Sequence, residues 1–250
     1  MRINVFFVAR EPGALDMADH TVVVIDVLRA TSCMIEALVN GAEGVYPAAS
    51  TEEAIKLASS LGREDTVLCG ESKGVMVEGF DLGNSPHEFV PEQVAGKRLV
   101  MATTNGTRAF LMAGDAARVI ACSFTNLEAV AREVADVDYL VVVCAGRAGM
   151  FSLDDAVCAG ALMRRVCERQ DGDVEFNDAG MAAMELANTF RVNADFLAAT
   201  WSGQRIIEIG LREDLELCAQ IDRHDVVPEM DDRVIRVRMS EPDREEAEPG

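Results

Sequence analysis

Side chains that can bind phosphate or a divalent cation stand at the ends of four short apolar runs in this 250-residue chain. The runs read TVVVIDVLRATS, TVLCGE, RLVMATTNGT and YLVVVCAGRAG, and they begin at Thr21, Thr66, Arg98 and Tyr139. Short apolar runs of this kind are typical of strands in a mostly parallel sheet, which is buried on both faces. Ligands of such sheets bind beyond the carboxyl ends of the strands. The four runs together therefore predict a single anion-binding site.

Carboxylates at these run ends suggest a metal site. Asp26 breaks a β-branched run just before a loop, and burying a carboxylate there is costly unless it is paired, hydrogen-bonded or bound to a metal. Asp154 and Asp155 begin a predicted helix, where Asp is also an ordinary first-turn residue. Hard oxygen ligands suit Mg²⁺. The predicted metal ligands are Asp26, Glu71, Asp154 and Asp155, of which Asp26 is also the first catalytic candidate. Alternatively, Asp26 only accepts hydrogen bonds from the loop amides of residues 29–31.

Hydroxyl, amide and guanidinium groups near the same run ends are candidates for binding a phosphorylated substrate. Residues 29–32 enter a predicted helix N-terminus, where free amides and the helix dipole favour an anion. The TTNGT segment repeats this arrangement, and the planar fork of Arg147, the second catalytic candidate, suits phosphate or carboxylate. The predicted substrate contacts are Arg29, Thr31, Ser32, Thr103, Thr104, Asn105, Gly106, Thr107 and Arg147. Helix capping and an ordinary turn are the alternative explanations of residues 31–32 and 103–107.

Other catalytic arrangements are missing from the sequence. The chain has no GxxxxGK[ST] nucleotide loop and no HExxH pair. Phosphate-monoester hydrolysis can need an acceleration of about 10²¹-fold, whereas one general acid or base supplies only about 10²–10⁴-fold. A metal ion with several oriented donors could cover the difference, so the size of the barrier also favours Mg²⁺.

The elements that must position these residues alternate along the chain. We predict strands over residues 2–8, 21–27, 43–48, 66–69, 98–102, 118–122 and 138–144, and helices over 31–40, 51–61, 105–113, 126–134 and 152–167. This alternation predicts an α/β domain with a mostly parallel sheet. Residues 70–89 contain four glycines and no clear period, which predicts a long functional loop.

The last third of the chain is predicted to be mostly helical, over residues 178–220, with a strand over 233–238. Residues 240–250 are acidic and contain proline, which is typical of a disordered tail. We therefore expect one α/β domain over residues 1–239, with a helical part from about residue 171 as a candidate subdomain, and a disordered acidic tail over 240–250.

The charge of the chain excludes some partners. The formal net charge is −20 and only three residues are lysine, so the surface should repel nucleic acid and anionic membranes. The expected partner is instead a small anionic phosphorylated substrate. Such a surface also predicts a halophilic source, and the alternative is codon bias that replaces lysine by arginine.

The salt dependence of stability separates these two explanations. If the acidic surface is a halophilic adaptation, the protein should be more stable in molar KCl than in dilute buffer, because salt screens the self-repulsion of the folded state. We expect the melting temperature to rise between about 0.1 M and 2 M KCl, where the Debye length falls from about 10 Å to below 3 Å. A flat or falling melting temperature would leave codon bias as the explanation.

The cysteines and the hydropathy predict a cytoplasmic protein. The seven cysteines include no CxxC pair, which favours buried free thiols in a reducing compartment over disulfides or a zinc site. No apolar run reaches the roughly 18 residues of a membrane span, and the first residues read as a strand without a cleavage site. We therefore expect no membrane partner, and the sequence leaves open whether the chain forms a homo-oligomer.

Four segments of the chain together resemble the 2-phosphosulfolactate phosphatase family. They read VIDVLRATSCMIEAL from Val24, GE from Gly70 with GFDLGNSP from Gly79, ATTNGTRAF from Ala102, and AGRAGMFSLDDAVCAG from Ala145. The resemblance implies a three-layer α/β sandwich and a Mg²⁺-dependent phosphatase. The implied substrate is (R)-2-phospho-3-sulfolactate, which is cleaved to 3-sulfolactate and phosphate on the route to coenzyme M. A phosphatase for another 2-phospho-carboxylate, a non-catalytic anion-binding module and a sugar-phosphate isomerase or other transferase are the alternatives.

Overall fold

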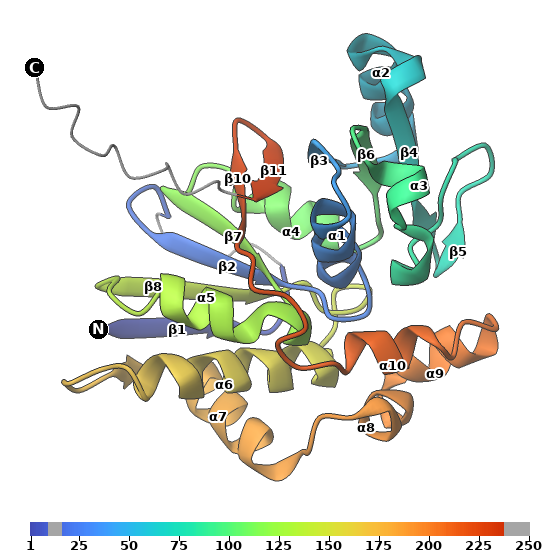
Figure 1. Ribbon diagram of the computed structural model, residues 1–250. Helices are drawn as coiled ribbons and strands as arrows, with labels where there is room; N and C mark the ends of the chain where they lie inside the picture. The colour runs from blue at the N-terminus through green and yellow to red at the C-terminus, as the bar shows by residue number, and fades with distance from the viewer. Residues whose placement is uncertain (10–16, 238–250) are drawn as a thin grey trace, which may run out of the picture.

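The computed structural model describes residues 1–9 and 17–237, and its strands form one large sheet (Figure 1). The strands are β1 (Arg2–Phe6), β2 (Thr21–Ile25), β3 (Gly44–Ala48), β4 (Thr66–Ser72), β5 (Val75–Met76), β6 (Arg98–Ala102), β7 (Arg118–Cys122), β8 (Tyr139–Cys144), β9 (Glu175–Phe176), β10 (Pro228–Asp231) and β11 (Val234–Val237). Their order is β5-β4-β6-β3-β11-β10-β7-β2-β8-β1-β9. Most neighbouring pairs are parallel, which confirms the predicted sheet.

Helices cover both faces of this sheet, so the predicted α/β sandwich is also confirmed. They are α1 (Ala30–Val39), α2 (Thr51–Leu61), α3 (Pro91–Val94), α4 (Gly106–Met112), α5 (Leu127–Glu133), α6 (Leu153–Cys167), α7 (Asp178–Thr189), α8 (Ala194–Ala199), α9 (Trp201–Glu208) and α10 (Asp214–Cys218), with short 3₁₀ turns at Arg63–Asp65, Pro86–Glu88 and Phe124–Asn126. Successive strand side chains point to opposite faces. In β2, Val23 and Ile25 pack with α5 and α6, whereas Val22 and Val24 pack with α1 and α4.

The predicted strand over 21–27 ends two residues early, and this places Asp26 outside the sheet. The backbone N–H of Asp26 donates to Thr31 Oγ1 at 3.1 Å, and its carbonyl accepts the N–H of Thr31 at 3.0 Å. Because these groups bond within the turn, they cannot continue the ladder between strands. The chain turns directly into α1, with Asp26 at the carboxyl end of β2.

The C-terminal hairpin of β10 and β11 lies in the middle of the sheet. It joins the parallel group β4-β6-β3 to the parallel group β7-β2-β8-β1, and it is antiparallel to both of its neighbours. The prediction of a strand over 233–238 found β11 and missed β10. The two strands are joined by Asp232 and Arg233, both with positive φ, which is the backbone of a tight two-residue hairpin turn.

The segment over residues 70–89 is more ordered than the predicted structureless loop. Strand β4 continues to Ser72, turns at Lys73 and Gly74, and returns as β5. Both turn residues have positive φ, which allows the sharp reversal. This β4–β5 turn lies next to α9, whose Arg205 donates to the carbonyl of Lys73.

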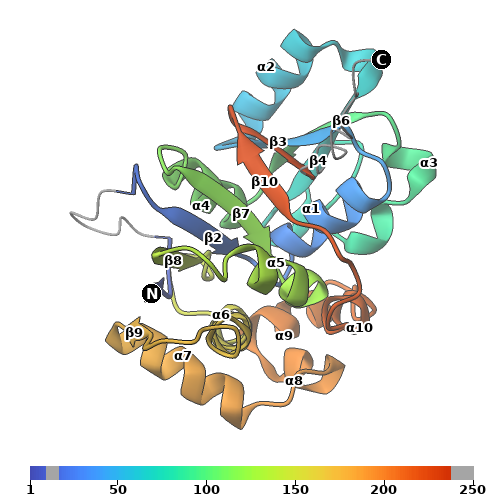
Figure 2. The same ribbon diagram turned by 60° about the vertical axis from the view of Figure 1, so that its left-hand side comes forward.

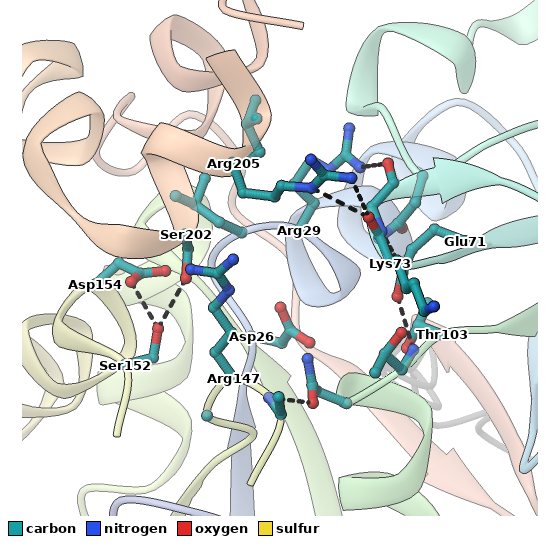
Figure 3. Close-up of a pocket in the computed structure, with 18 of the residues that line it drawn as sticks. Asp26, Arg29, Glu71, Lys73, Thr103, Arg147, Ser152, Asp154, Ser202 and Arg205 are labelled. Atoms are coloured by element: carbon teal, nitrogen blue, oxygen red, sulfur yellow. Dashed lines mark hydrogen bonds between the residues drawn. The ribbon is translucent and has the colours of Figure 1, made fainter. Parts of the chain in front are cut away.

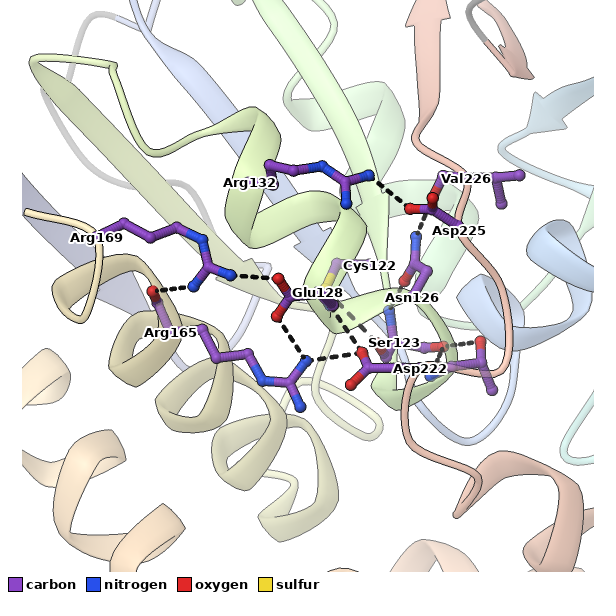
Figure 4. A network of polar contacts seen from close by, with 11 residues as sticks. Cys122, Ser123, Asn126, Glu128, Arg132, Arg165, Arg169, Asp222, Asp225 and Val226 are labelled. Carbon is purple, nitrogen blue, oxygen red and sulfur yellow. Dashed lines mark hydrogen bonds and ion pairs between the residues drawn. The ribbon is translucent and has the colours of Figure 1, made fainter.

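The last third of the chain folds into α7 to α10, and these helices lie with α6 on one side of the molecule (Figures 1 and 2). Ion pairs fasten the segment that follows α10 to α5 and α6 (Figure 4). Arg165 pairs with Asp222 at 2.7 Å, and Arg132 pairs with Asp225 at 2.6 Å. The segment leads into β10, so these pairs help to fix the path of the chain back into the sheet.

Two further expectations can be compared with the structure. All seven cysteines are free, and six of them are buried, as predicted. Among the described residues, no helix is long and apolar enough to cross a membrane. The predicted tail over 240–250 lies outside the described residues.

Candidate active site

A cavity of about 480 Å³ opens at the carboxyl ends of β2, β4, β6 and β8, where the sequence predicts a site (Figure 3). Helix α9 and the start of α6 complete its wall. The predicted residues that line it are Asp26, Arg29, Glu71, Thr103, Thr104, Asn105, Arg147, Asp154 and Asp155. The structure therefore brings together all four predicted metal ligands and both catalytic candidates.

Asp26 lies on the floor of this cavity and is 7% exposed. Its Oδ1 accepts a long hydrogen bond of 3.3 Å from the N–H of Ala30. The pKa of Asp26 is raised to about 7, mainly by burial and also by the neighbouring charges of Asp154 and Glu71, against the opposing effects of the Ala30 amide and Arg29. Asp26 therefore changes its charge near neutral pH, which suits a group that binds a cation or exchanges a proton.

Asp154 and Asp155 have different environments although they are adjacent at the start of α6. Asp155 accepts N–H bonds on both oxygens, from Val27 at 2.9 Å and from Gly146 at 3.1 Å. It therefore joins the ends of β2 and β8. Asp154 accepts the Ser152 hydroxyl on Oδ1 at 2.7 Å. Burial is the main cause that raises the pKa of each carboxyl group, and for Asp155 the charges of Asp154 and Asp26 add to it.

Glu71 connects the ends of β4 and β6. Its Oε2 accepts the N–H of Gly74 at 2.6 Å, and its Oε1 accepts the N–H of Thr104 at 2.7 Å. Next to Thr104, the side-chain oxygen of Asn105 accepts the N–H of Ala148 at 3.0 Å. The Nδ2 group of Asn105 is thus left to donate into the cavity.

The donor set fits a hard divalent cation. The charge of Asp154 raises the pKa of both Asp26 and Asp155, and the charge of Asp26 also raises that of Asp155. A cation among these three buried carboxyl groups would relieve that repulsion. In the part of the chain that the structure describes, no three acidic, histidine or cysteine side chains form a ready metal cage. Mg²⁺ needs no such cage, because it usually keeps several waters and uses one or two carboxylates plus substrate phosphate. Asp26 and Asp154 are the candidates, because both oxygens of Asp155 and of Glu71 already accept backbone N–H groups, whereas only one oxygen of Asp26 does.

Some predicted substrate contacts do not reach the cavity. Thr31, Ser32 and Thr107 are fully buried and do not line it. The hydroxyls of Thr31 and Ser32 donate to the carbonyls of Asp26 and Val27, both at 2.8 Å, so they shape the turn. The Thr107 hydroxyl bonds to Thr103. The structure therefore supports the alternative interpretation of these three residues, as capping and turn residues.

Gly106 and Arg29 have roles next to the site. A Cβ on Gly106 would lie 2.6 Å from Asp26 Oδ2, so glycine lets α4 approach the carboxylate rather than a ligand. Arg29 lines the cavity, but it donates to Asp214 at 2.7 Å and to the Gly74 carbonyl at 2.9 Å. The ion pair with Asp214 is buried, so most of the charge of Arg29 is already compensated.

Arg147 has a free side for a ligand. Its guanidinium lies over the Trp201 ring, 4.0 Å from the centroid, and Nη1 donates to the Trp201 carbonyl at 2.7 Å. No carboxylate among the described residues forms an ion pair with it. Since guanidinium carries five N–H donors, most of them remain available to a substrate anion.

Sequence reasoning missed Lys73, Asn84, Ser202 and Arg205, which also line the cavity. Asn84 is 5% exposed, and its Oδ1 has no hydrogen-bond partner among the described residues. Lys73 and Asn84 belong to the glycine-rich segment that was predicted to be functional, so that signal pointed to the right place without selecting residues. No pattern in the predicted helical third singles out Ser202 or Arg205.

The raised carboxyl pKa values predict how stability depends on pH without a divalent cation. A carboxyl group with a raised pKa in the folded state stabilises the fold below its unfolded pKa, near 4, and this contribution is lost as pH rises through the folded pKa. For Asp26 the window is therefore about pH 4 to 7. We expect the melting temperature in EDTA to fall by about 5 °C or more between pH 5.5 and 8.5, and Mg²⁺ to restore more of it at pH 8.5. In Asp26→Asn the fall should be smaller, and an equal fall would contradict the assignment.

The chain is similar to a known family of proteins over most of its length. A family model described as 2-phosphosulpholactate phosphatase matches residues 7–233. A protein of Caldanaerobacter subterraneus subsp. tengcongensis is 40% identical over 223 residues, which cover 88% of this chain and 92% of that protein. One of Symbiobacterium thermophilum is 41% identical, covering 87% and 94%, and one of Synechococcus sp. is 40% identical, covering 91% and 96%. Each of the three is named "Probable 2-phosphosulfolactate phosphatase".

Proposed function

The chain belongs to the 2-phosphosulfolactate phosphatase family, and we propose that it hydrolyses the phosphate monoester of a 2-hydroxy acid with the help of Mg²⁺. The observation that carries this proposal is the shared cavity, in which buried carboxylates face arginine and amide donors. An anion-binding module would need the donors but not the buried carboxylates, which destabilise an empty site at neutral pH.

Asp26 and Asp154 hold the metal in this proposal, and Asp155 and Glu71 position the loops around it. Bound Mg²⁺ would polarise the phosphoryl group and neutralise charge on its oxygens. The chain supplies the remaining donors. Arg147 and the Nδ2 group of Asn105 bind phosphate oxygens and orient the phosphorus for attack by water.

Arg147→Lys tests the part of the site that binds phosphate. Lysine keeps the charge, but an ammonium group cannot grip two oxygens at once or stack on Trp201 as the planar guanidinium does. We expect KM for the substrate to rise about tenfold, as the loss of one charge-assisted hydrogen bond implies. Arg212→Lys, at an exposed position that does not line the cavity, is the control. Unchanged KM and kcat in Arg147→Lys would remove this residue from the site.

The substrate we propose is (R)-2-phospho-3-sulfolactate, with hydrolysis to 3-sulfolactate and phosphate in the cytoplasm, on the route to coenzyme M. The names of the relatives support this choice. Another 2-phospho-carboxylate is the second candidate, because the donors described above bind the phosphate and not the rest of the molecule.

Release of inorganic phosphate is the experiment that tests the function. The purified protein should release phosphate from 2-phospho-3-sulfolactate, 2-phosphomalate or 2-phospholactate when Mg²⁺ is present, and EDTA should stop the reaction. A sugar phosphate and 4-nitrophenyl phosphate are the comparison substrates. Binding of these acids without phosphate release would favour the anion-binding module, and full activity in EDTA would remove the metal from the proposal.

A further inference from the structure

Two cationic side chains on the cavity rim come from elements outside the phosphate-binding loops. Arg205 lies on α9, and Lys73 lies in the β4–β5 turn (Figure 3). Both line the same cavity as Asp26. The C-terminal helices thus complete a site whose floor is built by the sheet.

Hydrogen bonds between these two residues hold them in place on the rim and leave N–H groups of both side chains free to bind an anion. Arg205 donates from Nε and Nη2 to the main-chain carbonyl of Lys73, at 3.3 and 3.1 Å. Its Nη1 donates to Glu208 at 3.2 Å, in an exposed ion pair that contributes little. Two of its five N–H groups remain unused. The Lys73 ammonium forms no ion pair within the described residues.

The neighbouring arginines, Arg29 and Arg147, are not available to bind a second anionic group. Arg29 is committed to Asp214, and Arg147 is used for phosphate in the function proposed above. Burial lowers the pKa of Arg147, and the positive charge of Arg205 lowers it further. The two guanidinium groups therefore repel each other across the cavity, and an anion bound near Arg205 would reduce that repulsion.

The pair of rim cations, Lys73 and Arg205, stands out against the negative charge of the whole chain. The formal net charge is −20, and Lys73 is one of three lysines. Although the chain is strongly acidic, Lys73 forms no ion pair among the described residues, and it stands beside Arg205 on the rim of the cavity. One metal-bound phosphate on the floor would leave Lys73 without a counterion and Arg205 with only its exposed partner Glu208.

We propose that Arg205 and Lys73 bind a second anionic group of the substrate, a sulfonate or carboxylate on carbon 3. This inference rests on the proposed function, because it assumes that phosphate occupies the floor. It makes the α9 helix and the β4–β5 turn the specificity elements of the site. Substrates without the second acid would then bind the floor alone.

Binding of the reaction product tests this inference without turnover. Calorimetry with Mg²⁺ present would compare 3-sulfolactate, malate and lactate, which carry a sulfonate, a carboxylate and no second acid on carbon 3. Lys73→Gln removes the ammonium but keeps the carbonyl that Arg205 binds, and Arg205→Gln removes the guanidinium. The matched controls are Lys56→Gln and Arg212→Gln, whose positions do not line the cavity.

We expect the preference for 3-sulfolactate over lactate, measured as a ratio of Kd values, to fall about 10–100-fold in Arg205→Gln. Lys73→Gln should lower it several-fold, and the controls should keep it. The comparison with malate tells whether sulfonate or carboxylate is preferred. If both variants keep the wild-type ratio, or the wild-type protein binds 3-sulfolactate no better than lactate, the inference is wrong even when phosphate is released. If the ratio falls but no phosphate is released, the anion site stands and the proposed reaction is wrong.

Discussion

Asp26→Asn should lower the rate of Mg²⁺-dependent phosphate release by about 1000-fold or more. The substitution removes a carboxylate on the cavity floor whose pKa is about 7. The Oδ2 atom of this carboxylate lies beside Gly106 at the start of α4. A factor of 1000 corresponds to about 4 kcal/mol of transition-state stabilisation, which is reasonable for loss of a metal ligand or a group that activates water. The measurement is kcat/KM for the best substrate of the panel.

The same variant should not be less stable than the wild type, and this separates the site from the fold. Asparagine has the same shape and can still accept the weak N–H bond of Ala30, while the buried charge is removed. In EDTA at pH 8 we expect an equal or higher melting temperature, since an ionised Asp26 destabilises the empty site. Asp136→Asn, at an exposed position, is the control. Retention of more than about a tenth of wild-type activity would show that Asp26 is not central.

Asp26 could be predicted from the sequence because its signal is local. A carboxylate that ends a buried strand needs a partner wherever the strand lies in the sheet, and parallel strands place their carboxyl ends along one edge. The same logic selected Arg147 and Thr104, and both line the cavity. It also selected Thr31, Ser32 and Thr107, since a hydroxyl that caps a helix and one that binds phosphate occupy the same sequence position. Only the hydrogen bonds of the folded chain separate these two uses.

Arg205, Lys73 and β10 could not be predicted because tertiary packing sets their positions. Arg205 reaches the cavity only because α9 packs beside the β4–β5 turn, a contact between residues 132 positions apart. Strand β10 has four residues and begins with proline, and it is antiparallel within a mostly parallel sheet. A short strand of this kind has no hydrophobic period to recognise. Helix α9 and the β4–β5 turn, which we propose to determine specificity, are thus the part of the site that sequence patterns do not predict.

Gly70→Ala should strongly destabilise the protein, with a loss of about 4 kcal/mol or failure to fold. Gly70 has a φ of +140°, where a side chain is strained. A Cβ would also lie 1.9 Å from the carbonyl oxygen of Ala102, a main-chain atom of the neighbouring strand β6. The N–H of Gly70 donates to the Gly83 carbonyl at 3.0 Å, so the backbone cannot rotate without breaking contacts on its other side.

Gly79→Ala is the matched control, because it isolates backbone strain from the clash. Gly79 lies in the same segment with a φ of +84°, and no atom lies within 4 Å of the position that an added Cβ would take. It should cost only about 1–2 kcal/mol, so the melting temperatures of the two variants should differ by about 5 °C or more. Equal melting temperatures would mean that β4 can move away from β6.

Because Glu71 follows Gly70 and bonds to Thr104 after β6, the close approach of the two strands also sets the width of the cavity. A folded Gly70→Ala protein should therefore lose phosphate release, whereas Gly79→Ala should keep it.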